Sequence, residues 1–97
     1  MSSEKEIILE ATAKANKREL SLDEAKDLVK NFPKSHRAIS LLAFIYFQQN
    51  KFEKVIEEIK RSLKYGKSTT AYNLSAQSNI NLQNFEAANQ DFSKALE

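Results

Sequence analysis

Residues 40–63 read SLLAFIYFQQNKFEKVIEEIKRSL, and residues 73–96 read NLSAQSNINLQNFEAANQDFSKAL, so one order of residue classes recurs after 33 positions. Residues of like class fall on one another: Ala43 on Ala76, Phe52 on Phe85, Val55 on Ala88, Ile59 on Phe92, Ser62 on Ala95 and Leu63 on Leu96. Each stretch carries two apolar blocks at helical spacing, joined by a short polar link. The unit is therefore a helical hairpin. Because one hairpin cannot bury both of its faces, neighbouring hairpins must stack.

Six blocks of helical periodicity cover the chain, each bounded by start or stop residues. Ser21 and Glu24 form a capping box that starts the second helix, and Pro33 stops it. Gly66 suits the left-handed residue that closes a helix. The sequence predicts helices over about 4–17, 21–31, 35–49, 52–65, 68–82 and 85–97.

Composition limits the chain to one small domain. Its 97 residues leave no room for two lobes with a cleft between them, and no apolar run approaches the roughly 20 residues of a membrane-spanning helix. One glycine and one proline are too few for the tight turns of a sheet protein, which favours an all-α fold. The chain has no cysteine and its first residues lack the apolar segment of a secretion signal, so we expect a reducing, cytoplasmic location.

The hairpin pattern resembles the tetratricopeptide repeat, a helix-turn-helix unit of 34 residues. Leu42, Ala43 and Tyr46 are similar to the core of that family's first helix, and Phe52 to the aromatic residue that opens its second. The resemblance implies a right-handed stack of three hairpins in a single domain over residues 1–97. These are a degenerate hairpin over 4–34, a repeat over 35–67, and a repeat over 68–97 with no capping helix after it. The residues expected to hold the stack together are Leu42, Ala43, Tyr46, Phe52, Val55, Ile59, Leu63, Ala76, Phe85, Ala88, Phe92 and Leu96.

The resemblance also implies a function, because in this family the first helices of successive hairpins line a concave groove that holds a segment of a partner protein. We therefore expect a non-catalytic adaptor or scaffold. Phe44 and Phe47 would form an aromatic anchor if their rings are open, and they would not if the first hairpin covers them. Asn73 and Gln77 would satisfy backbone groups of the partner. The groove positions implied by the family's spacing are Arg37, Ser40, Phe44, Phe47, Thr70, Asn73, Gln77 and Ile80.

Two other modes of interaction stay open at this stage. The last apolar helix has no polar capping helix after it, so either the chain is the first part of a longer repeat array, or Phe92 and Leu96 serve in self-association or in docking within a larger assembly. A basic middle region that includes Lys60, Arg61 and Lys64 allows RNA binding. Cations at a helix C-terminus are, however, already favoured by the backbone dipole.

Catalysis, metals and cofactors are not expected. His36 is the only histidine, no acidic residue pairs with it on a helix face, and we expect it to be an exposed first-turn residue. A metal site would need several convergent histidine, cysteine or carboxylate ligands. A phosphate-binding loop needs more than the single Gly66.

Overall fold

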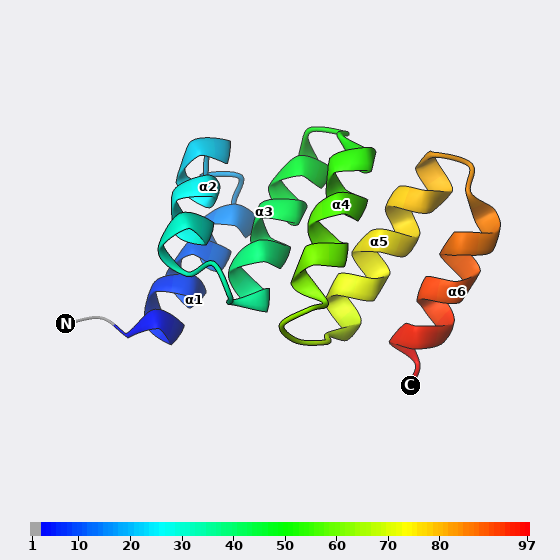
Figure 1. The fold of residues 1–97 in the computed structure, drawn as a ribbon. Coiled ribbons are helices and arrows are strands. Elements are labelled where there is room, and N and C mark those ends of the chain that lie inside the picture. Colours follow the sequence, from blue (N-terminus) through cyan, green and yellow to red (C-terminus); the bar gives the residue numbers. More distant parts are fainter. Residues whose placement is uncertain (1–2) are drawn as a thin grey trace.

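The computed structural model describes residues 3–97, and over that range it contains six helices and no strand (Figure 1). The helices are α1 (Glu4–Asn16), α2 (Leu22–Asn31), α3 (His36–Gln48), α4 (Phe52–Ser62), α5 (Thr69–Asn81) and α6 (Phe85–Ala95). They follow the predicted order and lie close to the predicted bounds, which confirms an all-α fold of helical hairpins. The largest difference is at α4, which ends at Ser62 rather than near Tyr65.

Serine side chains start four of the six helices. The Oγ atoms of Ser3, Ser21, Ser35 and Ser68 each accept a hydrogen bond from the backbone N–H three residues later. In α2 the capping box is complete, because a carboxylate oxygen of Glu24 also accepts from the Ser21 N–H at 3.1 Å. Each such cap stabilises its helix by about 1 kcal/mol. α4 and α6 have no side-chain cap, so the turn before each of them fixes where it begins.

The link inside each hairpin has the same backbone geometry. Arg18, Asn50 and Gln83 adopt positive φ angles of 59°, 60° and 65°. In each link the amide one residue later bonds to the carbonyl five residues before it, at 2.8, 3.0 and 2.8 Å. This is the Schellman arrangement, which satisfies carbonyls that a helix end leaves free. The first hairpin shares this turn, although its link, 17–21, is longer than the links 49–51 and 82–84.

The helices pack as an elongated array of 44 × 26 × 20 Å (Figure 1). Within hairpins α3 packs on α4 and α5 on α6, and between hairpins α2 packs on α3 and α4 on α5. Over residues 3–97, α1 and α2 lack the close backbone packing of the other two hairpins, and α1 packs on α3 instead. An exposed ion pair, Lys14 Nζ to Glu24 Oε2 at 2.7 Å, links the two helices of this looser hairpin.

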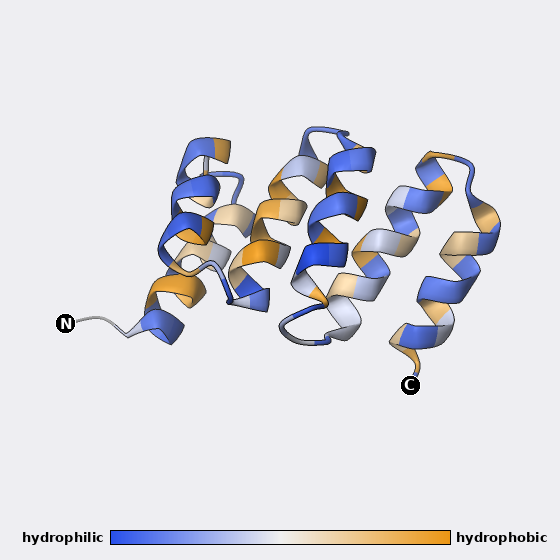
Figure 2. Ribbon diagram, in the orientation of Figure 1, coloured by the Kyte–Doolittle hydropathy of each residue, from blue (hydrophilic) through white to orange (hydrophobic). Residues whose placement is uncertain are grey.

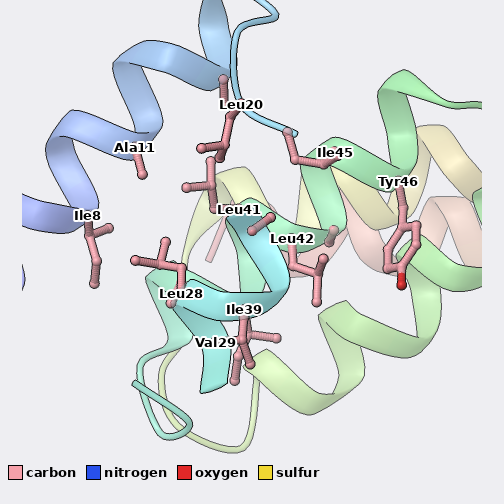
Figure 3. Close-up of a cluster of buried hydrophobic side chains, with 14 of the residues drawn as sticks. Ile8, Ala11, Leu20, Leu28, Val29, Ile39, Leu41, Leu42, Ile45 and Tyr46 are labelled. Atoms are coloured by element: carbon pink, nitrogen blue, oxygen red, sulfur yellow. The ribbon is translucent and has the colours of Figure 1, made fainter. Parts of the chain in front are cut away.

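The core is centred on α3. Ala43 of α3 and Ala76 of α5 are both completely buried, as the 33-residue repeat predicts, and their small side chains let neighbouring helices approach closely. Figure 2 shows that apolar residues are concentrated on α3, whereas α5 and α6 carry more polar ones. Figure 3 shows Leu20 and Leu28 of the first hairpin in the same apolar cluster as Leu41 of α3.

Three of the twelve residues expected to hold the stack together are exposed, whereas two are half-buried and seven are buried. Phe85, Phe92 and Leu96 expose 59%, 37% and 89% of their surface. All three belong to α6 or its C-cap, and within residues 3–97 no further helix packs on the outer side of α6. The expectation that all three hold this stack together was wrong, because the repeat pattern specifies a face that meets a following helix, and the pattern alone does not supply that helix.

Gly66 is explained by a close approach and not by a left-handed backbone, because its φ is not positive. A Cβ atom at Gly66 would lie 2.4 Å from Cδ2 of His36, so any side chain there would displace the imidazole. His36 is half-buried, and its carbonyl accepts a hydrogen bond from Ser62 Oγ at 2.9 Å. The expectations of a left-handed Gly66 and of an exposed His36 were therefore both wrong.

Candidate functional site

The first helices of the three hairpins adjoin one another along one side of the array. α1 packs on α3 and α3 packs on α5, whereas α2, α4 and α6 are not in comparable contact with each other over the described residues. Since the first helices are closer together than the second helices are, the array curves toward α1, α3 and α5. We call this side the inner face.

Two polar groove candidates begin the α3 part of the inner face. Arg37 is exposed in the first turn. Ser40 is half-buried, and its Oγ lies 2.9 Å from Ser62 Oγ in α4. Because Ser62 donates its own proton to the carbonyl of His36, Ser40 donates to Ser62. The Ser40 hydroxyl therefore ties α3 to α4 and keeps only acceptor capacity for a ligand.

Phe44 and Phe47 are neither fully open nor fully covered. Both rings are half-buried and pack against the hydrophobic core. The ring of Phe47 also meets Phe52 of α4 edge-to-face, with centroids 5.5 Å apart and planes at 73°. Part of each ring remains accessible, but both contribute to the stability of the hairpin, so truncating them would also loosen the fold.

The α5 part of the inner face is more polar. Thr70 and Gln77 are exposed, Asn73 is half-buried, and Ile80 exposes 43% of its surface as the one large apolar side chain among them. Elsewhere on α5, Ser75 Oγ and Asn79 Nδ2 donate to one carboxylate oxygen of Asp91 in α6, at 2.8 and 2.9 Å. Some polar side chains of α5 are thus hydrogen-bonded within the hairpin, whereas the amides of Asn73 and Gln77 remain accessible.

A second apolar surface lies on the outer side of α6, formed by Phe85, Phe92 and Leu96; we call it the outer face of α6. Sequence reasoning named Phe92 and Leu96 but missed Phe85, the most exposed phenylalanine. The signal was available, because Phe85 matches Phe52 in the repeat and lies at the same helix start as that residue.

Two carboxylates have displaced pKa values. Hydrogen bonds from Lys14 and from the Ser21 amide lower the pKa of Glu24 from 4.5 to about 2. Burial raises the pKa of Glu58, with Arg61 opposing the rise. Oε2 of Glu58 accepts no hydrogen bond although the Arg61 guanidinium lies 2.9 Å away. The pKa of the exposed Glu24 is thus displaced by local hydrogen bonds, and that of the half-buried Glu58 by burial.

One cation of the basic region is already paired with an acidic side chain. Arg61 is paired with Glu58, while Lys60, Lys64 and Lys67 are exposed around the end of α4. Among residues 3–97, no three histidine or acidic side chains converge in a way that could hold a metal ion. No helix in the described part of the chain has the length and apolar character needed to cross a membrane.

Comparison with known proteins gives a match to a family model. The family model described as anaphase-promoting complex, cyclosome, subunit 3 matches residues 23–95, a range that begins within α2 and takes in both full hairpins. No curated protein and no solved structure matches the chain.

Proposed function

The chain belongs to the family of anaphase-promoting complex, cyclosome, subunit 3, a family of tetratricopeptide-type repeats, and from this premise we propose that it binds a segment of a partner protein along its inner face. Repeats of this type form protein-protein interaction modules. In this proposal the chain is a non-catalytic adaptor or scaffold that uses the inner face.

The main support for the proposal is the contact between α3 and α5, because it brings two helices with different side-chain chemistry together on the inner face. α3 contributes the cation of Arg37 and the half-buried rings of Phe44 and Phe47, and α5 contributes an exposed aliphatic side chain and amides. A bound segment would insert an apolar side chain near Ile80.

Rigidity of the inner face supports this use. α3 buries seven of its thirteen residues, and its C-terminal turn reaches back to α1 through Gln48, whose Nε2 donates to the carbonyl of Ala15 at 3.1 Å. A face held in this way loses little conformational freedom when a ligand binds, so the flexible partner bears most of the ordering cost.

The test is selection of peptides from a displayed library against the intact protein, followed by affinity measurement with variants. We expect Ile80→Asp to weaken the selected peptides at least about tenfold, because a charge then meets their apolar anchor. Leu9→Asp is the matched control: Leu9 is an aliphatic residue of α1 with 54% exposure, comparable with Ile80, and it is not among the groove positions. Binding that survives Ile80→Asp, or amide chemical-shift changes confined to α6, would contradict the proposal.

A further inference from the structure

The outer face of α6 occupies the positions that α4 uses to receive α5. Phe85, Phe92 and Leu96 correspond to Phe52, Ile59 and Leu63 after the 33-residue shift. In α4 these residues are covered: Ile59 exposes 1% and the other two are half-buried, since α5 packs on that helix. The same three repeat positions are thus covered by a helix in the middle hairpin and exposed in the last hairpin.

Two shallow hollows repeat in the same way. One is lined by residues 50–54 of the α3–α4 link and the start of α4, together with Leu82 at the C-cap of α5. The other is lined by residues 83–87, which are the equivalent five, and by Gln90. The first hollow therefore contains a leucine from the following hairpin, and the second has no such contribution.

We propose that the outer face of α6 docks the first helix of a helical-repeat hairpin from a partner protein, in the way that α5 docks on α4. The covering helix in the middle hairpin defines what the partner must present. Ala71 and Leu74 pack against the core, Ser78 follows one turn further along the same stripe and is fully buried, and Leu82 lines the hollow. We therefore expect the partner helix to carry a small residue, followed by a leucine three residues later. A second small residue then comes seven residues after the first, and a second leucine eleven residues after it.

A second copy of this chain does not supply that helix. The turns and the buried alanines Ala11 and Ala43 align α1 with α3 at a shift of 32 residues. The stripe of α1 equivalent to 71, 74, 78 and 82 is then Glu6, Leu9, Ala13 and Lys17, all exposed. Charges stand at both ends of it, where α5 has Ala71 and Leu82. Among the other helices in residues 3–97, α3, α4 and α5 are each packed between two helices, α2 packs on α3, and α6 is the helix that carries the outer face.

The test converts α1 into the required helix and supplies it in trans. A donor chain carries Glu6→Ala, Ala13→Ser and Lys17→Leu, and its own outer face is blocked by Phe85→Glu and Leu96→Lys. All five positions are exposed, and each blocking charge has the sign that the helix dipole favours at that end. Mixed at about 100 µM with the unaltered protein, the donor is expected to form a 1:1 complex, seen in sedimentation equilibrium as a doubling of the 11.1 kDa mass.

An acceptor that also carries Phe85→Glu and Leu96→Lys is the matched control, and it must give no complex. The proposal fails if the donor ignores the unaltered protein or binds the blocked acceptor equally well. It also fails if the unaltered protein dimerises alone through Phe85 and Leu96, because the occupant is then a second copy. Ile80 is not part of the outer face of α6, so the outcome of the Ile80→Asp peptide experiment does not affect whether the donor binds. The two proposals can therefore fail independently of each other.

A second measurement does not depend on the donor folding. A copy of residues 64–96 is appended after Leu96, which repeats the register in which α5 follows α4. We expect the amides of α6 to gain at least about tenfold in protection from hydrogen exchange. Unchanged protection of α6 beside an appended hairpin would overturn the proposal.

Discussion

The middle hairpin, α3 with α4, and the last hairpin, α5 with α6, share a backbone plan but are filled with different chemistry. Leu42, Ile45 and Tyr46 of α3 are replaced at the equivalent positions of α5 by Ser75, Ser78 and Asn79, and all six residues are buried. The shared features are the completely buried alanines 43 and 76 and the Schellman turns. Small residues and turns thus define the shape of the repeat, while the residues that fill it determine how stable each copy is.

The largest expected contrast is between Ile59→Ala and Phe92→Ala, which truncate equivalent positions. Ile59 exposes 1% of its surface, so its loss leaves a cavity and should lower the free energy of unfolding by about 2–5 kcal/mol. Phe92 is 37% exposed, and truncating it should cost about 1–2 kcal/mol despite the larger side chain removed. Urea denaturation with a common m-value provides the comparison. Equal losses would show that the outer face of α6 is covered in solution.

The next contrast concerns the carboxylates at the equivalent positions 58 and 91. Asp91→Ala removes the shared acceptor of Ser75 and Asn79 and leaves two donors unpaired at the α5–α6 contact. We expect a loss of about 2 kcal/mol in the free energy of unfolding. Asp91→Asn retains one acceptor oxygen and should cost less, and a loss as large as that of the alanine variant would mean that the charge, not the acceptor, matters.

Replacing Glu58 should raise the free energy of unfolding, whereas replacing Asp91 lowers it. The buried Oε2 of Glu58 accepts no hydrogen bond, and its ion-pair partner Arg61 is exposed and remains hydrated without it, so Glu58→Leu is expected to stabilise the protein by about 0.5–1 kcal/mol at neutral pH. Burial raises the folded-state pKa above 4.5, so the folded state binds the proton more tightly than the unfolded state does. The penalty from Glu58 is therefore present above the raised pKa and disappears as pH falls to about 4.5. The gain of Glu58→Leu must shrink over that window in urea titrations, and a gain independent of pH would contradict the assignment.

The smallest contrast lies in the turns. Gln83 and Asn50 both have positive φ, a conformation that asparagine tolerates better than glutamine. Gln83→Gly should stabilise the protein by about 0.5–1 kcal/mol and Asn50→Gly by less. Thermal or urea unfolding of the two variants measures this difference. A loss of stability in Gln83→Gly would indicate that the glutamine side chain makes a contribution larger than its backbone strain.

Most of the fold follows from the sequence because its signals are local and repeated. Ser21 and Ser35 cap helices, Pro33 ends one, and the recurrence after 33 residues fixes which faces must meet. The role of Gly66 does not follow, since it depends on how closely the ring of His36 approaches a link distant in sequence.

The candidate site is less accessible to sequence reasoning. Helical spacing assigns Ser40 and Phe47 to a side of α3, but it cannot say that the hydroxyl of Ser40 donates to Ser62 or that the ring of Phe47 meets Phe52. These contacts depend on the rotamer that each side chain adopts against a neighbouring helix. The partner-binding set therefore stays a prediction, in which Thr70, Gln77 and Ile80 are the exposed α5 positions.

Native-state hydrogen exchange, resolved amide by amide, tests most directly the claim that α4 is covered by its successor and α6 is not. We expect α3 and α4 to exchange only through global unfolding and α6 to exchange through local opening, at a lower free energy. Equal protection of α4 and α6 in the unaltered protein would contradict the account.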